Sequence, residues 1–210
     1  MIFTKKYISE RVIEYNFGSE ISKDINDVVL KVYRFFLENI DKKSAGILDI
    51  VPSYTSLSIY FTSTCNLFED IDTYDNDVKK AIDMKENIKV DTHEVYVDYS
   101  GEDIEFVCKT LSLTKEQLIE LHVKSYSIAM IGFREHFPYL LGLDEKLNIP
   151  RRESPRTFVK KGSVAIAAGQ SGIYPLDLPG GWHIIGHTDF DKYELLKPSD
   201  IIIFKDKNAD

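Results

Sequence analysis

The stretch from Pro150 to Thr188 constrains the fold of this chain most, because glycines and prolines interrupt it at short intervals. Six of the eleven glycines lie between Gly162 and Gly186. Proline fixes φ and removes a backbone donor, whereas glycine permits positive φ and close backbone approach. This density indicates short strands joined by closely specified turns. Because functional residues gather on turns that a rigid scaffold holds, we expect a site here.

Composition limits the classes of function open to this chain. Its 210 residues allow one large domain or two small ones, and 43% hydrophobic residues support a packed core. A net charge of −8 disfavours broad binding to nucleic acid or an anionic membrane. Two isolated cysteines, Cys65 and Cys108, form neither a disulfide framework nor a zinc set. Without a signal-peptide pattern or a long apolar run, we expect a cytoplasmic protein.

The first part of the chain predicts a small α+β domain over residues 1–87. Ser22 is a plausible N-cap, and apolar residues then recur every three or four positions. The resulting order of elements places helices on one face of a sheet. In chain order, the predicted elements are a strand at 7–17, a helix at 22–40, strands at 47–51 and 57–61, and a helix at 75–87.

The rest of the chain, residues 88–210, predicts a mainly β domain. Alternating residues at 89–101 are typical of a half-buried strand, and Thr114 with Gln117 has the form of a capping box. Short, closely spaced strands favour a barrel or a sandwich. After a helix at 118–125, we expect a strand at 126–133, a loop at 134–143 and short strands at 158–159, 163–168, 172–175, 182–187, 193–196 and 200–204.

Familiar catalytic motifs are missing from the sequence. It contains no GxxxxGK[ST] or GxGxxG phosphate loop, no HExxH and no GxSxG elbow. His183 and His187 are four residues apart, but in an extended segment they would not share a helix face. We therefore predict no metal site and no nucleotide site of the P-loop or Rossmann kind.

A polar group of residues remains as the candidate site. Arginines offer forked donors for a carboxylate or phosphate, and histidines can act as acid or base near neutral pH. Arg156 is the strongest candidate, because Pro155 stiffens its loop. Equally, these arginines could be solvated or paired with acids, and the tryptophan could belong to the core. The predicted ligand-binding residues are Arg151, Arg152, Gln170, Tyr174 and Trp182, and the predicted catalytic residues are His122, Arg156 and His187.

The words PRR, PRT, GIYP and PGGW occur together between residues 150 and 182, after GFREHFPYLLGL. In this combination they resemble the signature of the KipI family, also called the allophanate hydrolase subunit 1 family. The resemblance is strong over residues 90–190 and weaker over the first domain. It implies an α+β N-terminal domain followed by a cyclophilin-like β-barrel.

This family includes the B subunit of bacterial 5-oxoprolinase. The resemblance therefore implies a protein that works with a homologous C subunit and with an A subunit. Together they open the small molecule 5-oxo-L-proline to L-glutamate while hydrolysing ATP, which the complex binds. The chain alone should be inactive. The alternative is a KipI-like protein that binds and inhibits a sensor histidine kinase.

Three positions depart from the family pattern. His187 stands where the family has arginine, His136 where it has glycine, and Ser171 where it has threonine. Replacing arginine by histidine exchanges a permanent, forked cation for a titratable ring. The departure at His187 therefore bears on the charge of the preferred ligand.

Overall fold

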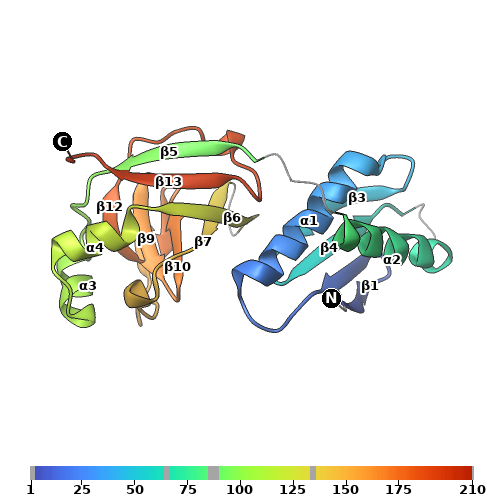
Figure 1. Ribbon diagram of the computed structural model, residues 1–210, viewed down its shortest axis with the longest axis horizontal. Helices are drawn as coiled ribbons and strands as arrows, with labels where there is room; N and C mark the ends of the chain where they lie inside the picture. Colours follow the sequence, from blue (N-terminus) through green and yellow to red (C-terminus); the bar gives the residue numbers. More distant parts are fainter. Residues whose placement is uncertain (1–2, 64–66, 85–89, 133–135, 210) are drawn as a thin grey trace. The chain divides into compact units, whose positions relative to one another are not determined.

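The computed structural model describes residues 3–63, 67–84, 90–132 and 136–209. Backbone contacts divide the chain into two compact units, Met1–Lys89 and Val90–Asp210 (Figure 1). The predicted boundary between residues 87 and 88 lies outside the described residues, and so does Cys65. Among the helices of the described part, none combines the length and apolar character that a membrane crossing needs.

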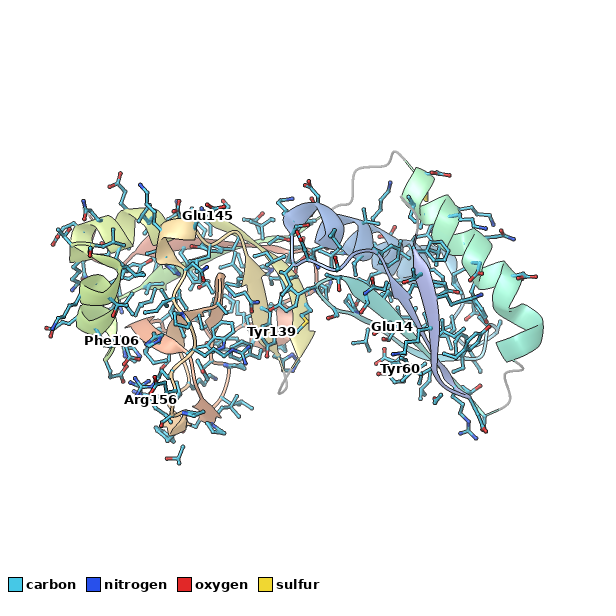
Figure 2. The ribbon with its side chains drawn as sticks, turned by 90° about the horizontal axis from the view of Figure 1, so that it is seen from below. Glu14, Tyr60, Phe106, Tyr139, Glu145 and Arg156 are labelled. Atoms are coloured by element: carbon cyan, nitrogen blue, oxygen red, sulfur yellow. The ribbon has the colours of Figure 1, made fainter. Side chains whose placement is uncertain are left out.

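The first unit is a four-stranded sheet with two helices on one face (Figure 1). Apolar residues of β2 and β4 alternate toward these helices, so Ile13 and Ile59 are buried against Phe36. Glu14 and Tyr60 lie on the opposite face of the sheet (Figure 2). The strands, in the order β1-β2-β4-β3, are β1 (Thr4–Ser9), β2 (Val12–Asn16), β4 (Ser56–Phe61) and β3 (Ile47–Pro52), and the helices are α1 (Lys23–Asn39) and α2 (Leu67–Asp83).

Two predictions for this unit need correction. The single strand expected at 7–17 is an antiparallel hairpin of β1 and β2, because the chain reverses at Glu10 and Arg11. Helix α2 begins at Leu67 rather than at residue 75. The N-cap prediction is confirmed: the Ser22 hydroxyl accepts a hydrogen bond from the Ile25 backbone N–H.

The second unit is a curled seven-stranded sheet with two short helices together at one end (Figure 1). The helices are α3 (Ile104–Leu111) and α4 (Lys115–His122). A separate two-stranded antiparallel sheet pairs β8 (Arg156–Val159) with β11 (Leu178–Gly180). The seven strands, in sheet order, are β12 (His183–His187), β9 (Ser163–Ala167), β10 (Gln170–Ile173), β7 (Phe137–Leu141), β6 (Ser125–Gly132), β13 (Ile201–Asp206) and β5 (Thr92–Val97).

The two edges of the curled sheet meet just beyond β5. Asp98 and His187 exchange backbone hydrogen bonds, each 2.8 Å long, so the sheet closes on itself at one bridge. Aliphatic and aromatic side chains fill its interior, among them Ile128, Leu140 and Phe204. The candidate site lies next to α3, at the end of the sheet where Asp98 and His187 pair.

Three predictions for the second unit also need correction. The loop expected at 134–143 contains β7, whose Phe137 and Leu140 are buried. Helix α3 was not predicted. The expected strand at 193–196 is instead a 3-10 turn, Tyr193–Leu195. The capping box is confirmed, since Thr114 and Gln117 exchange side-chain and backbone hydrogen bonds.

Candidate functional site

The loop from Pro150 to Pro155 lies against the start of β12. The Arg152 backbone N–H donates to the Gly181 carbonyl at 2.8 Å. The His183 Nε2–H donates to the Pro150 carbonyl at 3.0 Å. These bonds hold the arginine-rich loop in place, with one cleft on either side of Arg151 and Arg152.

The first of these clefts, here called the aromatic cleft, has a volume of about 290 Å³. Phe137 meets Tyr174 and Trp182 edge to face, with ring centroids 5.2 and 5.7 Å apart. Tyr139 meets Trp182 in the same way at 5.8 Å. These rings give the cleft an apolar wall. Its lining residues are Phe137, Tyr139, Arg151, Arg152, Pro155, Tyr174, Pro179, Gly180, Gly181 and Trp182.

Glycines let the backbone approach these rings. A Cβ at Gly180 would collide with the Tyr174 hydroxyl, and one at Gly172 would lie 3.0 Å from the Phe137 and Trp182 rings. Gly172 of the GIYP word and Gly180 of the PGGW word therefore allow the close packing of the cleft wall.

Arg151 supplies the cationic side of the aromatic cleft. Its guanidinium carbon lies 5.9 Å from the Trp182 ring centroid, within the range of a cation–π contact. Over the described residues, no acidic side chain forms an ion pair with Arg151. Burial raises the pKa of Tyr139, and the nearby Arg151 charge opposes that shift. The cleft thus combines aromatic rings with a cation that has no acidic partner within the described ranges.

The other two arginines share one carboxylate, that of Asp103. Asp103 Oδ1 accepts from Arg152 Nη1 at 3.0 Å and from Arg156 Nη2 at 2.7 Å. Asp103 Oδ2 accepts from the Ile184 backbone N–H at 2.8 Å, and the Asp103 N–H donates to the Ile184 carbonyl. We call Asp103, Arg152 and Arg156 the arginine clamp. It joins the start of α3 to β12 and to β8; Arg156 is labelled in Figure 2.

The clamp keeps Asp103 ionised. Burial raises the pKa of its carboxyl, but the hydrogen bonds from Arg156 and Ile184 and the two arginine charges outweigh burial, so the pKa is lowered. Arg152 Nε and Arg156 Nη1 are buried and have no acceptor among the described residues. Because Arg152 and Arg156 already donate to the same carboxylate, neither guanidinium is available to a ligand as that of Arg151 is.

The second cleft, here called the histidine cleft, has a volume of about 420 Å³. Phe106 and His183 stack in its wall with centroids 5.3 Å apart, and Figure 2 labels Phe106 at this end of the unit. Burial lowers the pKa of His183, so the ring is neutral near pH 7. Since its Nε2–H donates to Pro150, the buried Nδ1 is an acceptor without a donor among the described residues.

His122 lies in the core rather than at either cleft, which corrects its predicted placement beside the arginines. It is fully buried, stacked near Phe204, and hydrogen-bonded to the Tyr99 hydroxyl at 2.8 Å and to Ser171 Oγ at 3.0 Å. Burial lowers its pKa to about 3. A neutral ring enclosed in this way lines neither cleft, so it does not face a ligand bound there.

The structure separates the other predicted residues. Tyr174 and Trp182 line the aromatic cleft with Arg151, so these three predicted ligand-binding residues lie together. Gln170 is buried in β10 and lines neither cleft. His187 also lines neither, and its Nε2 lies 3.4 Å from a carboxylate oxygen of Glu102. No cluster of three or more potential metal ligands occurs among the residues that the structure describes.

Sequence reasoning missed Asp103, Phe137 and Tyr139. Asp103 is one of 34 acidic residues, and its partners lie about fifty positions further along the chain. Only the position of Asp103 just before a helix could have drawn attention to it. Phe137 and Tyr139 fell in the segment that we expected to be a loop.

Comparison with known proteins places this chain in a family. Residues 3–202 match the family described as "Carboxyltransferase domain, subdomain C and D". The B subunit of 5-oxoprolinase from Bacillus subtilis is 29% identical over 218 residues, covering 94% of this chain and 90% of that protein. The B subunit of 5-oxoprolinase from Haemophilus influenzae is 44% identical over 118 residues, covering 52% of this chain and 55% of that protein.

Among solved structures, that of TTHA0988 superposes with a TM-score of 0.78 at 28% identity. The match covers 95% of this chain and 40% of the TTHA0988 chain. The fold described above therefore corresponds to a part, about two fifths, of that longer protein.

Proposed function

This chain belongs to the family of the carboxyltransferase domain, subdomains C and D, and we propose that within it the chain acts as the B subunit of a 5-oxoprolinase. The reaction is 5-oxo-L-proline, ATP and water giving L-glutamate, ADP and phosphate. The observation that carries this proposal is the match to the 5-oxoprolinase B subunit of Bacillus subtilis over nearly the whole of both chains. The names of these relatives favour the enzyme subunit over a histidine kinase inhibitor.

In this proposal the chain contributes a binding surface and depends on the A and C subunits for turnover. The sequence contains no P-loop or Rossmann loop. The histidine that we expected to act as a base, His122, is buried and neutral. We therefore assign ATP binding to the complex as a whole, and the acid–base chemistry to residues other than His122. We also propose a cytoplasmic location and a cyclophilin-like class for the curled sheet.

Reconstitution tests this proposal directly. The A and C subunits from the same organism are purified with and without this chain, and glutamate and ADP are measured after adding 5-oxo-L-proline and ATP. We expect coupled turnover only when all three proteins are present. The control is the chain alone with both substrates, for which we expect none. Full turnover by the other two proteins without this chain would contradict the proposal.

A further inference from the structure

The aromatic cleft joins two properties that single out a class of ligand. Its walls are the rings of Phe137, Tyr139, Tyr174 and Trp182, and the one cation on it without an acidic partner among the described residues is Arg151. A ligand that suits both properties has an apolar ring and one negative charge.

We propose that the aromatic cleft binds a small ring carboxylic acid of the 5-oxoproline type, with the ring against Trp182 and the carboxylate on Arg151. The choice of ligand rests on the proposed function, whereas the choice of cleft and of cation rests on the geometry. The sequence does not distinguish Arg151 from Arg152 and Arg156. The structure does, because Arg152 and Arg156 belong to the arginine clamp and Arg151 does not.

The charge arrangement favours Arg151 over the clamp arginines. A carboxylate that approached Arg152 or Arg156 would compete with Asp103, which already lies 3.0 and 2.7 Å from their nitrogens. At Arg151 the same carboxylate meets an exposed guanidinium and gains charge-assisted hydrogen bonds without displacing another acid. Specificity for an acid therefore resides in Arg151, and the clamp positions the loop that carries it.

The size and polarity of the cleft agree with a small molecule. A volume of about 290 Å³ lies near the lower end of the range typical of ligand sites, which starts at about 300 Å³. The aromatic residues that line the cleft offer apolar surface to the CH₂ groups of a saturated ring. A nucleoside triphosphate would bring several negative charges to one unpaired guanidinium, so it is a poorer match.

Trp182 gives a direct readout, because it is the only tryptophan of the chain. The full chain is titrated, by fluorescence, with 5-oxo-L-proline, with 2-pyrrolidinone (the ring without the carboxylate) and with acetate (the carboxylate without the ring). We expect a saturable change with 5-oxo-L-proline and binding at least about tenfold weaker for the two fragments. The titration is repeated in the complex with the A and C subunits. This second measurement tests the case in which the other subunits complete the cleft.

Arg151→Gln should weaken 5-oxo-L-proline binding by about tenfold or more while leaving the response to 2-pyrrolidinone unchanged. The matched control is Arg11→Gln, which removes an exposed arginine from the turn between β1 and β2 in the other unit. Equal binding of 5-oxo-L-proline and 2-pyrrolidinone, or unchanged binding in Arg151→Gln, would overturn the inference. So would a Trp182 response to proline-rich peptides only, which would identify a protein partner.

This test and the reconstitution fail independently. If the complex turns over but 5-oxo-L-proline does not affect Trp182 in the chain or in the complex, the inference is wrong and the proposed function stands. If 5-oxo-L-proline binds through Arg151 but the complete complex produces no glutamate, the proposed function is wrong and the binding site stands.

Discussion

Arg151, in the loop, and Arg156, at the start of β8, lie five residues apart, yet their surroundings differ. Arg156 contacts a carboxylate whose side chain is only 6% exposed, in a clamp that ties α3 to β8 and β12. Arg151 is exposed, touches an aromatic ring and has no acidic partner in the described part of the chain. The comparison shows that the partner of an arginine, more than its motif, decides whether it supports the fold or can receive a ligand.

The largest effect should come from removing the shared carboxylate. Asp103→Asn leaves two partly buried guanidinium groups without a counter-charge, so we expect the free energy of unfolding to fall by about 2–4 kcal/mol. Urea denaturation monitored by circular dichroism measures it. Glu105→Gln, an exposed acid in the first turn of α3, is the control and should change little. A loss below about 1 kcal/mol would mean that the clamp does not hold the fold.

Arg156→Gln should have a smaller effect, because Arg152 still neutralises Asp103. We expect a loss of about 1–3 kcal/mol in unfolding free energy, from one charge-assisted hydrogen bond and a less well-compensated carboxylate. From the sequence we expected Arg156 to be a catalytic residue. Chemical denaturation of Arg156→Gln beside the unsubstituted chain decides between a structural and a catalytic role, and an unchanged midpoint would restore the catalytic one.

The buried histidine provides a pH-dependent comparison with these charged sites. The pKa of His122 is about 3 in the folded chain and near 6.5 in the unfolded chain. Its contribution to the free energy of unfolding is therefore fully present above pH 6.5. As pH falls from 6.5 toward 3, the unfolded state binds the extra proton and stability falls, by at most about 1.4 kcal/mol per pH unit.

Thermal unfolding between pH 7 and pH 4 checks this dependence. The His122→Gln variant should be less stable at pH 7. Its stability should also fall less steeply as the pH is lowered, because the contribution of His122 to that dependence is removed. His136→Gln, which alters an exposed histidine, is the control. Identical slopes in all three proteins would mean that His122 does not titrate as its burial requires.

The smallest effect on stability should come from Arg151→Gln. It removes an exposed cation–π contact and no ion pair that the structure describes, so we expect a change below about 1 kcal/mol. Differential scanning calorimetry beside Arg156→Gln tests this. If Arg151→Gln destabilises the chain as much as Arg156→Gln does, the distinction between a structural and a ligand-binding arginine fails.

The sequence by itself determined the elements whose signal is local. The three-to-four spacing of apolar residues predicted α1, Ser22 and Thr114 marked the starts of helices, and alternation predicted β5. Each depends on residues within a few positions of one another, and backbone hydrogen bonding acts at that range. The glycine and proline words likewise predicted the short strands from residue 163 to residue 187, and they led us to expect a site near the arginine-rich loop.

Only the tertiary structure decided which side chains meet. The edge-strand closure at Asp98 and His187 joins residues far apart in the chain, and so does the contact of Asp103 with Arg156. The burial of His122 follows from the curling of the sheet around it, which periodicity does not record. Local patterns encode backbone conformation, whereas charge pairing and desolvation arise only when distant segments are brought together. For that reason the loop could be chosen from the sequence, but Arg151, which has no acidic partner in the part of the chain that the structure describes, could not be singled out within it.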